Sequence, residues 1–194
     1  MHFEVEQKFE VSDLAASRRR LDGLGVSWAD SVFQVDRYYA HPVCDFRKTD
    51  EALRIRSVGE RNCVTYKGPK IDATTKTRRE IELPLSDGRY AASQFAELLE
   101  SLGFQPVLAV SKGRQPGQID WEGRVVHVAL DTVEGLGVFV ELEVNCEEDH
   151  VADARQTIAS LAHKLELTRN QRMSYLELLL RVNDKMSVGE REQE

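Results

Sequence analysis

The sequence has 194 residues, of which 41% are hydrophobic and 30% are charged, and its formal net charge at pH 7 is −7. This length supports one domain with a single hydrophobic core, and the negative net charge argues against a general nucleic-acid binder, although a basic pocket can lie inside an acidic shell. No run of about 18 apolar residues and no signal-peptide pattern is present, so we expect a cytoplasmic protein without a membrane partner.

Four helices are predicted from hydrophobic periodicity and from capping residues. They run from Ser12, the expected N-cap, to about Leu21, then over 90–102 and 151–165, and finally from about Met173 through 180. The segments between them are predicted as strands. We expect one domain over residues 1–182, followed by a disordered tail over 183–194.

The predicted strands alternate apolar and charged residues, and the charged residues of each strand share one face. In the first strand, Val5 and Phe9 alternate with Glu4, Glu6 and Lys8. An open sheet with one face in water would explain any single strand of this kind. However, a solvated face is usually richer in Thr, Ser and Gln, and the helices are too few to protect the edges of a wide sheet.

These observations favour an α+β fold that is mainly antiparallel β, with a closed barrel and peripheral helices. A barrel of this kind would have a polar lumen that contributes little to folding and needs a functional explanation. The predicted lumen residues are Glu4, Glu6, Lys8, Glu10, Arg54, Arg56, Lys67, Arg78, Glu80, Glu82, Lys112, Arg114, Asp131, Glu141 and Glu143.

The basic residues of this lumen predict a site for a polyanion. Facing one cavity, they would repel one another unless an anion of comparable charge lay between them, and a triphosphate has about that charge. Arginine can bind two phosphate oxygens at once, whereas lysine acts as a point charge. The predicted substrate-binding residues are Lys8, Arg54, Arg56, Lys67, Arg78, Lys112 and Arg114, and those expected to act in catalysis are Lys8, Arg56 and Lys67.

The acidic residues of the lumen predict a divalent cation. Glu4 with Glu6, and Glu141 with Glu143, stand at positions i and i+2 of a strand, so each pair points the same way and can bind Mg²⁺ or Mn²⁺. Asp131 is a further candidate ligand. The alternative is that these carboxylates only neutralise the basic residues in a lattice of salt bridges.

Other kinds of site are disfavoured. The cysteines Cys44, Cys63 and Cys146 form no CxxC pair, so we expect reduced thiols rather than a disulfide framework or a zinc site. The five histidines form no HExxH motif and no plausible catalytic triad, and a glycine-rich phosphate loop is missing.

The first strand, Glu4-Val5-Glu6-Gln7-Lys8, resembles the ExExK signature of the CYTH superfamily, also called triphosphate tunnel metalloenzymes. Further motifs follow in the family's order and extend the resemblance over residues 3–180. They are Leu53-Arg54-Ile55-Arg56, 65–69, 78–82, Lys112 with Arg114, Leu130-Asp131, 134–137, Glu141-Leu142-Glu143 and 174–179. The resemblance implies an eight-stranded antiparallel tunnel, basic walls that bind a triphosphate, and acidic residues that bind Mg²⁺ or Mn²⁺.

Within the superfamily, residues 34–56 resemble the class IV adenylyl cyclases, which implies conversion of ATP to cyclic AMP and pyrophosphate. Cys44 and Arg79 depart from this branch, since arginine and an acidic residue are expected there. The alternatives are a triphosphatase that hydrolyses inorganic, thiamine or nucleoside triphosphate, and a binding module without catalysis. The sequence does not determine the oligomeric state, for which a homodimer is one option.

Overall fold

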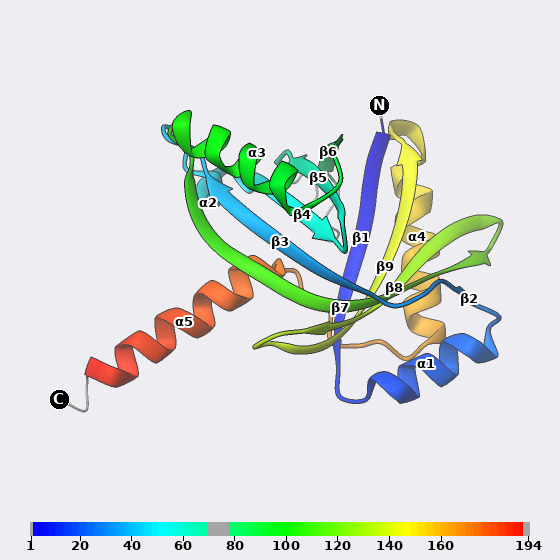
Figure 1. The fold of residues 1–194 in the computed structure, drawn as a ribbon. Helices are drawn as coiled ribbons and strands as arrows, with labels where there is room; N and C mark the ends of the chain where they lie inside the picture. The colour runs from blue at the N-terminus through cyan, green and yellow to red at the C-terminus, as the bar shows by residue number, and fades with distance from the viewer. Residues whose placement is uncertain (1, 70–77, 192–194) are drawn as a thin grey trace.

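The computed structural model describes residues 2–69 and 78–191 (Figure 1). None of the helices in this part of the chain is long and apolar enough to cross a membrane. The strands are β1 (His2–Val11), β2 (Ser27–Trp28), β3 (Val32–Ala40), β4 (Ala52–Val58), β5 (Arg61–Lys67), β6 (Arg78–Leu85), β7 (Gln105–Trp121), β8 (Arg124–Val133) and β9 (Gly137–Glu147). The helices are α1 (Leu14–Gly23), α2 (Phe46–Thr49), α3 (Arg89–Ser101), the short 3₁₀ helix η1 (Glu148–His150), α4 (Val151–Lys164) and α5 (Tyr175–Arg191).

Eight strands close into an antiparallel barrel, which confirms the predicted fold class. Their order around the barrel is β7-β3-β4-β5-β6-β1-β9-β8, and β8 pairs back with β7. The long strand β7 makes this closure possible, because its first part pairs with β3 and its second part pairs with β8. The remaining strand, β2, pairs with β7 outside the ring.

The main hydrophobic core lies between the outer wall of the barrel and the helices α1 and α4. On the outward face of β1, Val5 is 0% exposed and lies opposite Val144 of β9, whereas Lys8 on the other face lies opposite Glu141. The outward residues pack against Ile158 and other apolar residues of α4. Alternation along each strand therefore places apolar residues in this core and charged residues in the lumen.

The helices α1, α2 and α5 differ most from the prediction, whereas α3 and α4 differ from it by at most one residue at each end. α1 begins at Leu14, and its N-cap is Asp13 rather than Ser12, because the Asp13 carboxylate accepts a hydrogen bond from the amide of Ala16. α2 was not predicted, because its single turn is too short to show a helical periodicity. α5 continues to Arg191, so the boundary expected at residue 183 falls inside a helix, and residues 192–194 lie outside the described chain.

A first prediction tests the location of the core. Ile158 is 0% exposed, so Ile158→Ala is expected to lower the free energy of unfolding by about 2–5 kcal/mol. The matched control is Leu98→Ala in α3, where the side chain is 50% exposed and the change should stay within about 0.5 kcal/mol. Urea denaturation measures both values, and equal losses would contradict a core centred on α4.

Candidate functional site

One cavity of about 1090 Å³ occupies the barrel lumen and its mouth. The structure brings six of the predicted basic residues to this cavity, together with both predicted glutamate pairs. They are Lys8, Arg54, Arg56, Lys67, Lys112, Arg114, Glu4, Glu6, Glu141 and Glu143. Arg78 lies opposite Glu4 across the β1–β6 pair, but its side chain lies outside the described structure. Asp131 does not line the cavity and is 0% exposed.

Asp36 of β3 holds the two arginines of β4 in place. Its carboxylate accepts hydrogen bonds from Arg54 Nη1 at 3.1 Å and from Arg56 Nε and Nη2 at 2.7 and 2.9 Å. Asp36 is 2% exposed and lies directly opposite Arg56 in the strand register. Although burial opposes its ionisation, the neighbouring arginines hold the pKa of Asp36 well below its ordinary value. The carboxylate is therefore charged and fixes both guanidinium groups.

Asp131 of β8 does the same for the basic pair of β7. It accepts hydrogen bonds from Lys112 Nζ at 3.1 Å, from Arg114 Nε and Nη2 at 2.7 and 2.6 Å, and from the Tyr175 hydroxyl at 2.9 Å. With these donors around it and none of its surface exposed, Asp131 is poorly placed to bind a metal ion. The geometry argues against the predicted metal role and indicates instead an anchor for Lys112 and Arg114.

These two aspartates correct one step of the reasoning from sequence. The basic residues were expected to repel one another unless a ligand anion lay between them, but buried carboxylates already neutralise part of their charge. Asp36 was not among the predicted lumen residues. The sequence pattern that could have identified it is the alternation of Gln34, Asp36 and Tyr38 along β3. All three side chains are buried in the structure.

Lys67 of β5 joins the basic and acidic sides of the lumen. Its ammonium group lies 2.6 Å from Glu4 Oε2 and 2.7 Å from Glu80 Oε2. Burial opposes the ionisation of Glu80, but its hydrogen bond with Glu4 and the charge of Lys67 lower the pKa of Glu80 to about 2. The pKa of Lys67 is raised, because attraction by carboxylates, of which Glu4 contributes most, outweighs the effect of burial. Lys67 therefore carries its positive charge throughout the physiological range.

A cluster of glutamates faces this basic wall. Burial and the nearby carboxylates of Glu4 and Glu6 raise the pKa of Glu143 to about 8, while Asn145 donates a hydrogen bond to Glu143 Oε1 at 2.8 Å. Glu141 accepts a hydrogen bond from Arg114. Within residues 2–69 and 78–191, no group of three or more His, Cys, Asp or Glu side chains forms a ready-made metal site.

This cluster nevertheless fits a hard divalent cation. Repulsion among Glu4, Glu6 and Glu143 would be relieved by a cation between them, and Mg²⁺ usually keeps several waters and takes further oxygens from phosphate. A few carboxylates that leave coordination positions open for water and phosphate oxygens suit Mg²⁺ in this way.

Two basic groups indicate where a bound anion would be most favourable. Burial, followed by the charge of Arg114, lowers the pKa of Lys112 to about 8. Arg54 Nε is buried and makes no hydrogen bond within the described part of the chain. A phosphate oxygen near these groups would favour the charged form of Lys112 and provide an acceptor for Arg54.

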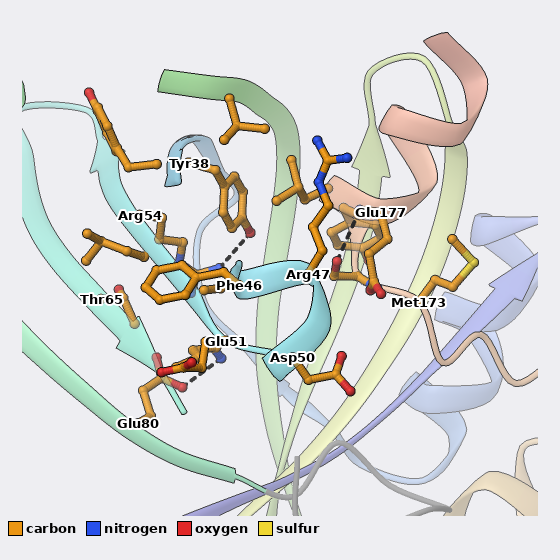
Figure 2. Close-up of a pocket in the computed structure, with 18 of the residues that line it drawn as sticks. Tyr38, Phe46, Arg47, Asp50, Glu51, Arg54, Thr65, Glu80, Met173 and Glu177 are labelled. Atoms are coloured by element: carbon orange, nitrogen blue, oxygen red, sulfur yellow. Dashed lines mark hydrogen bonds and ion pairs between the residues drawn. The ribbon is translucent and has the colours of Figure 1, made fainter. Parts of the chain in front are cut away.

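Residues of α2 and α5 lie at the mouth of the cavity. Figure 2 shows Phe46 and Arg47 of α2, with Asp50 directly after the helix, on one side, and Met173, which precedes α5, and Glu177 of α5 on the other. Because α2 was not predicted, the sequence did not show that these segments lie together. Phe46 and Met173 give this mouth apolar surface, which can pack against an organic group attached to a polyanion.

Comparisons with known proteins agree with this geometry. The model of the CYTH domain family matches residues 2–175. A protein of Methanocaldococcus jannaschii named "Putative adenylate cyclase" is 35% identical over 178 residues, which are 90% of this chain and 97% of the relative. Adenylate cyclase CyaB of Aeromonas hydrophila is 32% identical over 174 residues, 87% and 83% of the two chains. A solved structure of a Pyrococcus horikoshii protein has a TM-score of 0.81 and 38% identity, and covers 92% of this chain and 98% of its own.

A second prediction concerns Glu143 in the metal-free protein. Its pKa is about 8 in the folded state against an ordinary 4.5, so the stability that it contributes is complete below about pH 4.5 and is lost as the pH rises to 8. Glu143→Gln should remove this loss and raise the free energy of unfolding at pH 8 by roughly 1–2 kcal/mol. Urea denaturation in EDTA at pH 5 and pH 8 measures it, and an unchanged pH dependence would contradict the crowding of carboxylates.

A third prediction separates Asp131 from the candidate metal ligands. Asp131→Asn removes the fully buried carboxylate that both Lys112 and Arg114 contact, and within the described chain leaves Arg114 with Glu141 alone, so the free energy of unfolding of the metal-free protein should fall by about 3–5 kcal/mol. This effect is opposite in sign to that of Glu143→Gln. The same denaturation experiment at pH 7.5 compares them, and a gain in stability for Asp131→Asn would contradict the role as an anchor.

Proposed function

Because the chain belongs to the CYTH family, we propose that it is an adenylyl cyclase that converts ATP to cyclic AMP and pyrophosphate with Mg²⁺ or Mn²⁺. The observation that carries the proposal is the cavity itself, where basic residues from four strands face a cluster of glutamates. The choice of ATP and of cyclisation rests on the names of the two curated relatives. We place the reaction in the cytoplasm, with a small-molecule triphosphate as substrate and without a nucleic-acid or membrane partner.

The triphosphate would bind between the two anchored basic pairs. Arg54 and Arg56 lie on β4 and Lys112 and Arg114 on β7, the two strands that flank β3, and each pair is fixed by its buried aspartate. Fixed guanidinium groups can bind phosphate oxygens with little loss of conformational freedom on binding. The remaining positive charge comes from Lys8 and Lys67, which lie on β1 and β5.

Glu4, Glu6 and Glu143 are the residues that would hold the divalent cation. When bound, this cation withdraws charge from the phosphoryl groups and helps to orient them. Glu141 contributes indirectly in this account, because it is hydrogen-bonded to Arg114 and so orients a group that binds phosphate.

In cyclisation, the ribose 3′-oxygen attacks the α-phosphorus and pyrophosphate leaves, so negative charge develops on the leaving group. Lys8, Arg56 and Lys67 are the residues that we expect to stabilise this charge, because they are held in place before the reaction begins. Lys67 is suited to this role since its raised pKa keeps it protonated. The enclosed lumen also strengthens these interactions relative to bulk water.

A fourth prediction tests the reaction. Purified protein given ATP with Mg²⁺ or Mn²⁺ should release cyclic AMP and pyrophosphate, resolved by chromatography. Lys67→Ala and Arg56→Ala should each lower the rate by about 10²–10³-fold through loss of electrostatic stabilisation. The control is Lys48→Ala, a lysine of α2 whose side chain is 83% exposed and does not line the cavity.

The same assay distinguishes the alternatives when inorganic triphosphate and thiamine triphosphate are supplied separately. Orthophosphate without cyclic AMP would defeat the cyclase proposal in favour of a triphosphatase. Tight binding of these triphosphates without any product would instead favour a binding module without catalysis.

A further inference from the structure

Tyr175 is buried although it opens a helix that leads away from the barrel. It is 7% exposed, while α5 continues from it toward the C-terminus at the edge of the molecule (Figure 1). Its side chain lines the lumen cavity and belongs to a small apolar cluster that includes Phe139. An aromatic side chain with a hydroxyl group is therefore inserted into the charged lumen from outside the barrel.

This one side chain contacts residues from four strands. Its hydroxyl donates a hydrogen bond to Asp131 Oδ2 of β8 at 2.9 Å. Its ring lies 3.8 Å from the ammonium nitrogen of Lys8 on β1 and 5.0 Å from that of Lys112 on β7. The edge-to-face contact with Phe139 of β9, at 5.0 Å between ring centroids, orients the ring.

The contact with Lys8 differs from the other interactions of the basic wall. The face of an aromatic ring attracts an ammonium group without placing a negative charge beside it. The ring can thus help to fix the position of Lys8, which is 1% exposed.

The backbone before Tyr175 is tied to the same lysine. The amide of Gln171 donates a hydrogen bond to the carbonyl oxygen of Lys8 at 2.7 Å, and Asn170 forms a β-bridge with Phe9. Ser174 and Glu177 then cap α5 reciprocally, since each side chain accepts a hydrogen bond from the other's amide. Tyr175 is therefore held on both sides in the sequence, which fixes where its ring enters the lumen.

We propose that Tyr175 is a positioning residue that sets the place of the Lys8 ammonium group with its ring and that of the Asp131 carboxylate with its hydroxyl. The second part rests on the proposed function, because Asp131 in turn orients the basic pair expected to bind the triphosphate. Tyr175 thereby links the C-terminal segment of the chain to the basic wall of the tunnel.

The test separates the ring from the hydroxyl. Tyr175→Phe keeps the ring and removes the hydrogen bond to Asp131, whereas Tyr175→Leu removes both. Tyr90→Leu is the control, since this tyrosine of α3 is 74% exposed. In protein labelled with ¹³C at lysine Cε, the Lys8 signal is expected upfield of the other lysines because of the ring, and Lys8→Arg assigns it by its disappearance.

The upfield signal should persist in Tyr175→Phe and in Tyr90→Leu and should be lost in Tyr175→Leu. This NMR measurement needs no ligand. If the wild-type protein binds no triphosphate, the proposed function is defeated, but the test of the ring remains valid. A Lys8 signal that is ordinary in the wild type, or unchanged in folded Tyr175→Leu, would overturn the role of the ring.

The role of the hydroxyl is tested by binding. Calorimetry with inorganic triphosphate and Mg²⁺ should show about 10-fold weaker binding for Tyr175→Phe than for the wild type, as expected for the loss of a hydrogen bond to a charged group. Tyr90→Leu should bind as the wild type does. Equal affinities of the wild type and Tyr175→Phe would overturn this part, and this comparison remains valid if Tyr175→Leu does not fold.

Discussion

The structure depends on how positive charges are kept together inside a barrel. Basic groups at close range repel strongly away from bulk water, and burying each of them costs free energy. Asp36 and Asp131 offset this cost, since each lies behind two basic side chains and is itself almost completely buried. Because the aspartates lie behind the basic groups rather than between them and the cavity, the front of each group still faces the lumen. The wall is preorganised for a polyanion.

This use of the lumen is possible because the hydrophobic core lies elsewhere. The outward faces of β1, β8 and β9 pack against α1 and α4 and provide most of the apolar burial. The interior of a small barrel is usually filled by side chains. Here the apolar side chains are buried outside the barrel, so the interior can hold charged residues and a cavity. Closure of the ring through β7 also leaves its strands paired on both sides, so that residues from distant parts of the chain meet in one cavity.

The sequence predicted this division because strand periodicity assigns each residue to one of two faces, as for Lys8 and Val5 in β1. The pairing of charges could not be predicted in the same way. Which carboxylate meets Arg56 depends on the register between β3 and β4, and the different roles of Asp131 and Glu141 follow from their depth and their neighbours. α2 and the insertion of Tyr175 were not predictable from periodicity, because one is a single turn and the other depends on packing across four strands.

We propose that anchored basic groups and a cluster of glutamates together bind a triphosphate and a divalent cation. The most direct measurement is a crystal structure with inorganic triphosphate and Mn²⁺, with the metal located by its anomalous scattering. We expect phosphate oxygens in contact with Arg56, Lys67 and Arg114, and manganese beside Glu4, Glu6 or Glu143. Triphosphate bound outside the barrel, or manganese at Asp131 with those glutamates unoccupied, would contradict it.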